Sequence, residues 1–567
     1  MRLRQLVPAW LQHYQRQWLS GDLTAGLIVT VMLIPQSLAY AMLAGLPPEM
    51  GLYASILPLF AYALFGTSMS LAVGPVAVAS LMTASALTPL AAVGSPEYIS
   101  LAVLLALLSG LMLFLFGLLR LGFLAYFLSH PVISGFISGS AVLIAIGQLK
   151  YILGIKLVSG NLLSTVSGLI HGLAQANPTT SVIGVAALLS LFAARRYLGA
   201  LLQACGVRAT TASLMTRLAP MAVVIIATAI VASLRLDLNA AVAVVGHVPS
   251  GLPMPSVPVI EWQMISVLWL PALLISLVGF VESVSVAQSL ALKRGQRITP
   301  DKELLGIGAA NLASALSGGY PVTGGFARSV VNFSAGANTP AAGMVSAVLM
   351  AAVIAAFTHW FYYLPHAVLA ATIIVAVVAL IDIKTLQEAW HYDRADAISL
   401  LLTFGGVVLL GVEEGIIIGV ALSLAVLVWR SSRPHMAVVG RVPGTEHFRN
   451  VDRFQVETQA GVIALRIDES LYFANAHALE EKIENLVDAQ PQTRRLILIM
   501  SAINQLDTTA LGVLTELERT LAERHIALQF AEIKGPVLDR LRHTELGLRM
   551  KERIFLSTHQ AFISTTA

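Results

Sequence analysis

The sequence is short of two residue classes that soluble proteins have in quantity: charged residues and cysteine. Only 12% of the 567 residues are Asp, Glu, Lys or Arg, about half the ~25% share of a soluble chain. The one cysteine, Cys205, excludes an internal disulfide and any metal site built from several cysteines. No metal-ligand spacing, phosphate-binding loop or Ser/His/Asp set stands out. We therefore expect neither a cofactor nor enzymatic activity.

The few charges are distributed unevenly along the chain. Residues 1–433 hold 20 Lys/Arg and 14 Asp/Glu, whereas residues 434–567 hold 15 and 17. The first part is therefore about 8% charged and the second about 24%, which is the soluble norm. This contrast predicts a membrane domain over 1–433 and one soluble domain over 434–567. The net charge of +4 comes from the membrane part, so loop topology explains it better than nucleic-acid binding.

Long apolar runs are what the first part has in abundance. A full membrane span needs about 20 apolar residues. Fourteen runs are candidates: 22–45, 50–66, 71–89, 98–119, 128–149, 178–197, 219–235, 268–291, 302–319, 324–337, 339–360, 365–382, 396–412 and 414–431.

The third and tenth runs are short, and each opens on a break that contains glycine and proline. The breaks read Val73-Gly74-Pro75-Val76 and Tyr320-Pro321-Val322-Thr323-Gly324-Gly325. Non-helical backbone survives in a membrane only where it is buried in protein or lines a cavity. Because each break is in the third run of a set of seven, the pair predicts a seven-plus-seven inverted repeat with a transport site at the two half-helices.

The Lys/Arg distribution predicts the orientation. Positive residues concentrate on the cytoplasmic side of a membrane protein. With fourteen spans, the side of both termini holds sixteen: Arg2, Arg4, Arg16, Arg120, Arg195, Arg196, Arg208, Arg217, Lys293, Arg294, Arg297, Lys302, Lys384, Arg394, Arg430 and Arg433. The other side holds Lys150, Lys156 and Arg235. We therefore expect cytoplasmic N- and C-termini.

Ionisable residues are rare inside the apolar runs, and two stand out: Glu282, midway along the eighth, and Arg328, just after the break of the tenth. Such residues are functional candidates by default. A lone carboxyl group in a low dielectric can bind and release a proton near neutral pH, which suits a proton-coupled carrier. A buried guanidinium beside a helix N-terminus suits an anion. Alternatively, the two residues neutralise each other, or Glu282 bonds to backbone, without a role in transport.

The first run contains a proline, Pro35, and two polar side chains, Gln36 and Tyr40. Pro35 removes a backbone donor and can open the helix locally. Gln36 and Tyr40 are four residues apart, so they share one helical face and could both hydrogen-bond an anion. Alternatively, Pro35 is a plain kink and the other two side chains pack between helices.

The second part of the chain alternates between strand and helix patterns. Strands are expected near 462–467, 496–500 and 526–532, and helices near 476–487, 508–522 and 536–541. This alternation predicts an α/β domain with parallel strands.

These features together resemble the SulP family of anion transporters. The matching stretches are Ile34–Ala44, Pro47–Tyr53, Gly66–Ser68 and Val73–Ala77, and the tail resembles a STAS domain through Leu471–Ala476 and Asp507–Ala510. The resemblance implies an α-helical polytopic membrane protein of fourteen transmembrane segments in a seven-plus-seven inverted repeat with core and gate domains, plus a C-terminal α/β STAS domain. It also implies a homodimer and an elevator-like shift of the core.

The resemblance further implies roles for individual residues. The family's anion-site positions fall on Gln36, Tyr40, Val76, Ala327 and Arg328. Val76 replaces an aromatic and Ala327 a serine of other members, so backbone N–H groups and Arg328 would matter more. Glu282 matches the coupling glutamate of proton-coupled sulfate carriers, whereas the Asp/Thr pattern of sodium-coupled bicarbonate members is absent. Thr509 corresponds to a serine that is phosphorylated in related STAS domains, and capping or packing is its alternative role.

The function that we expect is secondary active uptake of sulfate with protons across the bacterial cytoplasmic membrane. Alternatives within the family are a C4-dicarboxylate or bicarbonate transporter and a channel-like, voltage-responsive protein such as prestin. Glu282 argues against the last, because a coupling carboxylate has no purpose in a passive pore. Nucleobase permeases of the same fold are expected to lack the STAS tail and Arg328.

Overall fold

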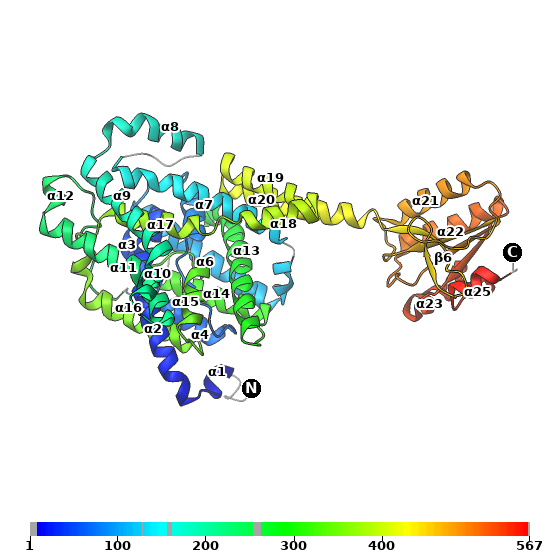
Figure 1. The fold of residues 1–567 in the computed structure, drawn as a ribbon, viewed down its shortest axis with the longest axis horizontal. Helices are drawn as coiled ribbons and strands as arrows, with labels where there is room; N and C mark the ends of the chain where they lie inside the picture. Colours follow the sequence, from blue (N-terminus) through cyan, green and yellow to red (C-terminus); the bar gives the residue numbers. More distant parts are fainter. Residues whose placement is uncertain (1–7, 127–128, 156–161, 253–261, 565–567) are drawn as a thin grey trace. The chain divides into compact units, whose positions relative to one another are not determined.

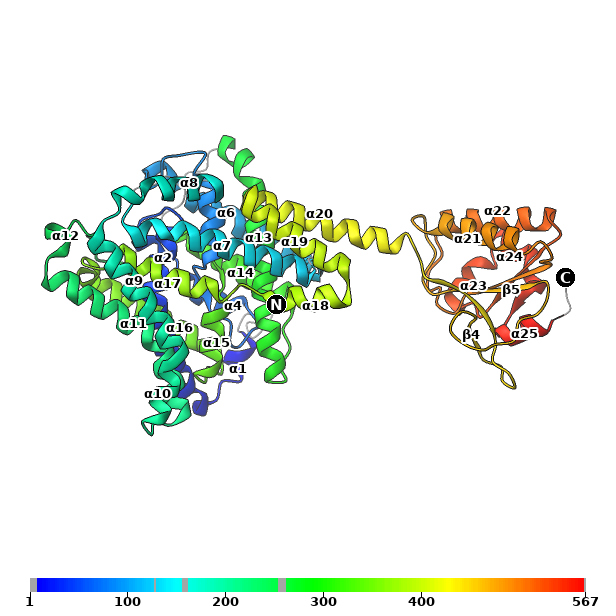
Figure 2. The same cartoon turned by 45° about the horizontal axis from the view of Figure 1, so that its top comes forward.

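The computed structural model describes residues 8–126, 129–155, 162–252 and 262–564. The chain forms two compact units, Met1–Ser423 and Leu424–Ala567, which Figures 1 and 2 show from two directions. The first unit is helical, and the second contains a six-stranded sheet. Arg2, Arg4 and Lys156, which contribute to the predicted orientation, lie outside the described residues.

Each of the fourteen apolar runs coincides with a helix or a pair of helices. Among the described residues, nine helices are long and apolar enough to cross a membrane. The helices that match the runs are, in order, α2 (Leu19–Leu43), α3 and α4 (Pro48–Tyr53, Leu57–Phe65), α5 (Ala77–Leu87), α6 (Pro96–Leu118), α7 (His130–Leu153), α9 (Pro178–Ala193), α11 (Ala209–Ser233), α13 (Trp262–Lys293), α14 (Pro300–Leu316), α15 (Phe326–Ser334), α16 (Ala341–Ala356), α17 (His366–Val378), α19 (Arg394–Leu409) and α20 (Val412–Ser431).

Two further helices of ten or more residues were not expected from the sequence among the described residues of this unit. They are α8 (Leu162–Gly172) and α18 (Ile383–Tyr392), and at about 1.5 Å per residue both are too short to span a bilayer. Ile383 and Trp390 of α18 are more than half exposed. A short helix with exposed apolar residues and polar neighbours is typical of the membrane interface, and such helices carry no span-length hydropathy signal.

The helices pack in pairs that repeat between the two halves of the unit. If the first seven segments correspond in order to the last seven, α2 corresponds to α13, α6 to α16, α7 to α17 and α9 to α19. The packing of α16 on α2 then has its counterpart in α6 on α13, and that of α7 on α19 has its counterpart in α17 on α9. These reciprocal pairs agree with the seven-plus-seven repeat expected from the two breaks.

The two breaks are neighbours in the structure. Val73–Gly74 forms strand β1 and Thr323–Gly324 forms strand β2, and the two pair antiparallel with Val73 opposite Gly324. The short helices α5 and α15 begin two or three residues after them. Segments some 250 residues apart therefore cross inside the helical unit, as the paired breaks predict.

One end of this unit is held by a buried carboxylate at the start of α14. Glu303 is fully buried. Its carboxylate accepts hydrogen bonds from the Tyr62 hydroxyl of α4 at 2.7 Å and from the backbone N–H groups of Thr67 and Ser68 at 2.7 and 3.0 Å. The residue thereby fixes the chain that leads from α4 to β1.

A second buried carboxylate, Asp22 of α2, performs the same task for the chain between α15 and α16. It accepts hydrogen bonds from the N–H groups of Asn338 and Thr339, at 2.6 and 3.0 Å, and from the Thr339 hydroxyl at 2.7 Å. Charge-assisted bonds of this kind are about twice as strong as neutral ones. The chain before β1 and the chain after α15 are thus each anchored to a helix N-terminus.

The sheet of the second unit has the strand order β4-β3-β5-β6-β7-β8. The strands are β3 (Met436–Arg441), β4 (Phe448–Asn450), β5 (Val462–Ile467), β6 (Arg495–Ile499), β7 (Ala527–Ala531) and β8 (Ile554–Phe555). The pairs from β5 to β7 are parallel, as expected, and β8 adds a further parallel strand that the sequence did not indicate. At the other edge, β3 and β4 pair antiparallel. They were not expected either: β4 has only three residues, and the six residues of β3 are mostly apolar and do not alternate with polar ones.

Helices cover both faces of this sheet. Ile463, Leu465 and Leu498 pack in one core with α21 (Ala476–Ala489) and α22 (Thr508–Glu523), and Ala464 and Ile497 pack on the other side against α25 (Thr558–Ile563). Since successive strand residues point to opposite faces, a continuous apolar run such as β6 is buried on both. The unit therefore has a core of its own.

The Glu303 network leads to a prediction about stability. Glu303→Ala leaves the Tyr62 hydroxyl and two backbone N–H groups buried without an acceptor, and each hydrogen bond to a charged group contributes about 1.5–3 kcal/mol. We expect a loss of about 3 kcal/mol or more, seen as a lower apparent Tm of the purified protein in detergent. Glu97→Ala is the matched control, because Glu97 also lies in the first turn of a membrane helix but is exposed. Equal Tm values for both variants would show that the network does not stabilise the unit.

Candidate substrate site

The site is built on the first turns of the two half-helices. Helix α5 follows Val76 and helix α15 follows Gly325, and both of these preceding residues have extended backbone. The side chain of neither residue accepts a hydrogen bond from the first N–H groups of its helix, since Val76 is apolar and Gly325 has no side chain. The first N–H groups of a helix have no partner within the helix and carry a partial positive charge. Two such helix starts therefore face the same space.

A small cavity occupies that space, with about 50 Å³ available to the centres of water molecules. A single water needs roughly 10–15 Å³ by this measure, so the cavity has room for a small solute. Five helices, namely α2, α5, α13, α15 and α17, and the two breaks contribute its walls: Gln36, Tyr40, Val76, Ala77, Val78, Glu282, Gly325, Phe326, Ala327, Arg328, Ala376, Val377 and Leu380. The structure thus brings together all six residues of the membrane part that the sequence singled out, namely Gln36, Tyr40, Val76, Glu282, Ala327 and Arg328.

Arg328 is the main charged group of the cavity. Its side chain is 2% exposed, and both terminal nitrogens, Nη1 and Nη2, are buried without a hydrogen-bond partner among the described residues. A buried charge without a partner is unfavourable unless something else supplies the opposite charge. The guanidinium is therefore available to a bound anion.

The glycines of the two breaks make room for this guanidinium. A Cβ atom on Gly325 would lie 2.9 Å from Nη2 of Arg328, and one on Gly74 would lie 3.3 Å from Nη1. Both positions thus let the cation lie directly against the strand backbone. This places the charge of Arg328 beside both helix starts at once.

Glu282 lines the same cavity but does not form an ion pair with Arg328. Among the described residues, no carboxylate oxygen of Glu282 lies within 4.0 Å of an Arg328 nitrogen. Direct mutual neutralisation, one of the alternatives for these two residues, is therefore not present in the structure. The carboxyl and the guanidinium lie on different walls of one small cavity.

Polar side chains satisfy the backbone of the tenth-segment break. Asn311 of α14 donates to the carbonyl of Val322 at 2.8 Å and accepts from its N–H at 2.9 Å. The Ser283 hydroxyl of α13, next to Glu282, accepts from the N–H of Gly324 at 2.8 Å. Since no water is present in a bilayer core to bond these groups, the two side chains allow extended backbone at this depth.

The third-segment break is held in the same way from α15. The Ser329 hydroxyl accepts from the N–H of Ala72 at 2.9 Å, and the Asn332 amide donates to the carbonyl of Ser70 at 3.1 Å. Tyr320 and Ser80 add a hydroxyl–hydroxyl bond of 3.1 Å between the tenth-segment break and α5. The residue after Arg328 therefore anchors the opposite strand.

Sequence reasoning missed two groups of residues here. Asn311, Ser283 and Ser329 are polar residues inside apolar runs, and that position was a signal that could have been followed. Ala376, Val377 and Leu380 at the end of α17 form the apolar wall of the cavity. They offer no signal, because apolar residues in an apolar span are indistinguishable from those that face lipid or the core.

Two other sequence-derived features have clear positions. Helix α2 runs unbroken through Pro35 and presents Gln36 and Tyr40 on one face. In the second unit, Thr509 is exposed in the first turn of α22, and the side chain that caps this helix is that of Asp507, which accepts from the N–H of Ala510 at 2.8 Å. The cap of α22 is therefore not Thr509.

Comparison with known proteins agrees with this architecture. Residues 19–403 match the Sulfate permease family, and residues 453–561 match the STAS domain. The chain is 34% identical to "Sulfate transporter 4.1, chloroplastic" of Arabidopsis thaliana over 97% of this chain and 81% of the relative. It is 35% identical to "Probable sulfate transporter MT1781" of Mycobacterium tuberculosis over 94% of this chain and 93% of the relative.

A solved structure confirms the fold. The murine Solute Carrier 26 family member A9 anion transporter, solved in the inward-facing state, superposes with a TM-score of 0.86 over 99% of this chain and 94% of its own, at 23% identity. The multi-pass helical unit with a C-terminal STAS domain is thus the fold that the sequence predicts, and the family is one of transporters, not of enzymes. The chain belongs to the Sulfate permease family of membrane anion transporters and carries a C-terminal STAS domain.

Proposed function

We propose that this protein takes up sulfate together with protons across the bacterial cytoplasmic membrane. The observation that carries the proposal is the buried Arg328, whose unpartnered nitrogens lie at two helix starts in a cavity that Glu282 shares. Anion transport is the family's activity, and the relatives reported above are named as sulfate transporters. Gln36 and Tyr40 would donate further hydrogen bonds, while Val76 and Ala327 would contribute mainly their backbone.

The charges around the cavity support a link between protons and anions. Each helix start contributes about +0.5 charge, and Arg328 contributes one full charge. With Glu282 protonated, the groups at the cavity sum to about +2, and with Glu282 ionised to about +1. A divalent anion is therefore bound more favourably when Glu282 carries a proton.

Sulfate needs such a link to enter a cell. A membrane potential that is negative inside opposes the entry of each negative charge by about 2.3 kcal/mol per 100 mV, or roughly 4.6 kcal/mol for sulfate. Two protons cancel this cost, and three allow the potential to drive uptake. One carboxyl group binds one proton, so Glu282 couples transport to the pH gradient without setting the stoichiometry.

An elevator-type movement is supported by how the repeat symmetry is broken. Helix α2 packs on α11 and α17. The repeat-related packing of α13 on α20 and on α7 is much less extensive among the described residues. The two cavity helices α2 and α13 therefore contact their repeat-related neighbours unequally, as expected if the part of the unit that holds the cavity can shift to the reciprocal arrangement.

The remaining parts of the proposal follow the sequence and the family resemblance. The transport domain spans residues 1–433 and the STAS domain residues 434–567, with both termini in the cytoplasm and two chains forming a homodimer. Thr509, exposed at the start of α22, is the candidate phosphorylation site of the STAS domain.

A transport assay in proteoliposomes tests the proposed function. Uptake of labelled sulfate, bicarbonate and succinate is measured, each with and without an inward proton gradient. Gradient-driven accumulation of bicarbonate or succinate but not of sulfate would overturn the proposal that sulfate is the substrate.

Arg328→Ala should weaken sulfate binding by roughly 10- to 150-fold, because a charge-assisted hydrogen bond contributes about 1.5–3 kcal/mol. The anion-free variant should unfold at the same temperature as the native protein or higher, since a buried unpaired charge is removed. Binding is measured on purified protein by titration calorimetry, with the exposed Arg297→Ala as control. An unchanged affinity in Arg328→Ala would assign Arg328 a structural role.

Glu282→Gln should separate exchange from uphill transport. The amide resembles the protonated carboxyl group, so sulfate binding and sulfate–sulfate exchange should persist, whereas accumulation driven by a pH gradient should fail. Both are followed in the same proteoliposomes, and Glu97→Gln, an exposed glutamate of α6, is the control. Full proton-driven accumulation by the variant would remove Glu282 from the coupling mechanism.

A further inference from the structure

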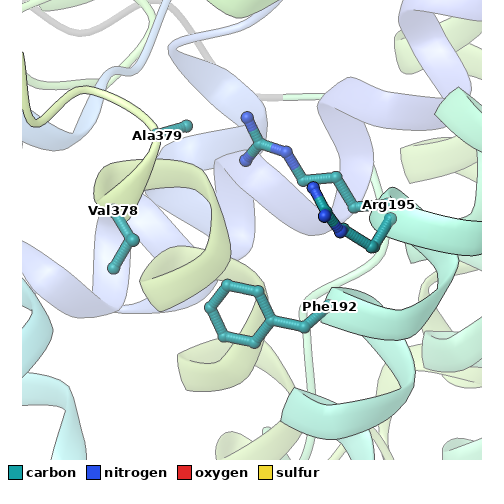
Figure 3. Close-up of a pocket in the computed structure, with 5 residues that line it drawn as sticks. Phe192, Arg195, Val378 and Ala379 are labelled. Atoms are coloured by element: carbon teal, nitrogen blue, oxygen red, sulfur yellow. The ribbon is translucent and has the colours of Figure 1, made fainter.

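A second cavity of the helical unit lies at the ends of α9 (Pro178–Ala193) and α17 (His366–Val378). It has about 440 Å³ available to the centres of water molecules and is lined by Phe192, Arg195, Arg196, Val378 and Ala379. Figure 3 shows Phe192 and Arg195 extending towards the end of α17 that carries Val378 and Ala379. The first three residues come from the end of α9 and from the π-helical turn Ala194–Leu198 that follows it. We call this cavity the α9–α17 groove.

The groove carries positive charge that its own walls do not balance. Nη1 of Arg195 donates to the carbonyl of Val375 at 3.1 Å, which caps the end of α17. Arg196 is exposed and has no ion-pair or hydrogen-bond partner among the described residues. The carboxylate that follows α17, Asp382, already accepts from Thr385 at 3.0 Å. An anion is therefore the complement that the groove lacks.

The rest of the groove is apolar and continues into an exposed apolar surface. Phe192 and Val378 are 39% and 38% exposed. Further along α9, Val182, Val185 and Leu189 are also exposed, in the helical stretch Pro178–Ala204, which is long and apolar enough to cross a membrane. The two arginines directly follow the 16 residues of α9, so the positive charge adjoins one end of its exposed apolar face.

We propose that the α9–α17 groove binds one phospholipid with an anionic headgroup. Its phosphate would lie between Arg196 and Arg195, and an acyl chain would pass over Phe192 and along α9. Basic pockets between transmembrane helices, at the level of the headgroups, are suited to such lipids. A free anion could use the two arginines but not the apolar wall, and exposed arginines alone hold a soluble anion weakly.

The bound lipid would contact the helix end that also walls the candidate substrate site. Ala376, Val377 and Leu380 line the central cavity, while Val378 and Ala379 of the same turn line the groove. A lipid in the groove therefore supports this wall from behind. The lipid site itself does not depend on the proposed function.

Native mass spectrometry of the full-length protein tests the lipid site. The protein is reconstituted in nanodiscs of equimolar phosphatidylglycerol and phosphatidylcholine, and the ratio of the two lipids that it retains is measured. We expect phosphatidylglycerol to be retained preferentially. Arg196→Gln should lower the ratio about fivefold, the change expected for about 1 kcal/mol per arginine near the membrane surface, and Arg195→Gln/Arg196→Gln should lower it further. Arg297→Gln removes the same charge from an exposed loop and should leave the ratio unchanged.

A photoreactive phosphatidylglycerol locates the contact, because it should label peptides from the ends of α9 and α17 in the native protein and not in the double variant. Retention ratios and labelling that are unchanged in the double variant would overturn the proposal. So would loss of the labelling on addition of inorganic phosphate, which would assign the groove to a soluble anion. A double variant that changes the oligomeric state but not the lipid ratio would assign the groove to a second copy of the chain and likewise overturn it.

Discussion

The whole helical unit depends on one requirement, that every backbone N–H and C=O group at membrane depth has a partner. The crossed strands β1 and β2 meet it with a short antiparallel pairing and with polar side chains from α13, α14 and α15. Because the strands are satisfied, the helices that follow them can begin in the middle of the protein. Their uncapped first turns carry a partial positive charge, so the pairing that satisfies the strands also places positive charge where we propose that the anion binds.

The site contains one basic side chain, Arg328, and one acidic side chain, Glu282. Arg328 lies against the backbone of Gly74 and Gly325, and its nitrogens have no partner among the described residues. Glu282 lines the same cavity without pairing with it. The arrangement differs from a closed ion pair, in which each group would cancel the other and leave nothing for a ligand. In the function that we propose, keeping the two charges apart leaves the positive one for the anion and the acidic one for a proton.

Helix α17 links several parts of the structure. It packs on α7 and α9, lines the central cavity with one side of its last turn, and lines the α9–α17 groove with the other. The carboxylates Asp22 and Glu303 instead anchor the chain after α15 and the chain before β1. One wall of the site therefore belongs to α17, a helix that also lines the α9–α17 groove. The chain next to α5 and α15, on the opposite side, is held by buried hydrogen bonds.

The sequence by itself determined which segments are apolar enough to enter the membrane, where along the chain the share of charged residues rises, and which two segments contain a break. It could do so because hydropathy, charge and Gly/Pro content are local properties of the chain. It also pointed to Glu282 and Arg328, since ionisable residues in apolar runs stand out. Only the tertiary structure decided that the two breaks pair, that Glu282 and Arg328 do not, and that Ala376, Val377 and Leu380 close the cavity. The antiparallel edge formed by β3 and β4 was likewise decided there. The physical reason is that contacts between segments hundreds of residues apart depend on how the helices pack. The identity of an apolar side chain does not indicate which other side chain it will contact.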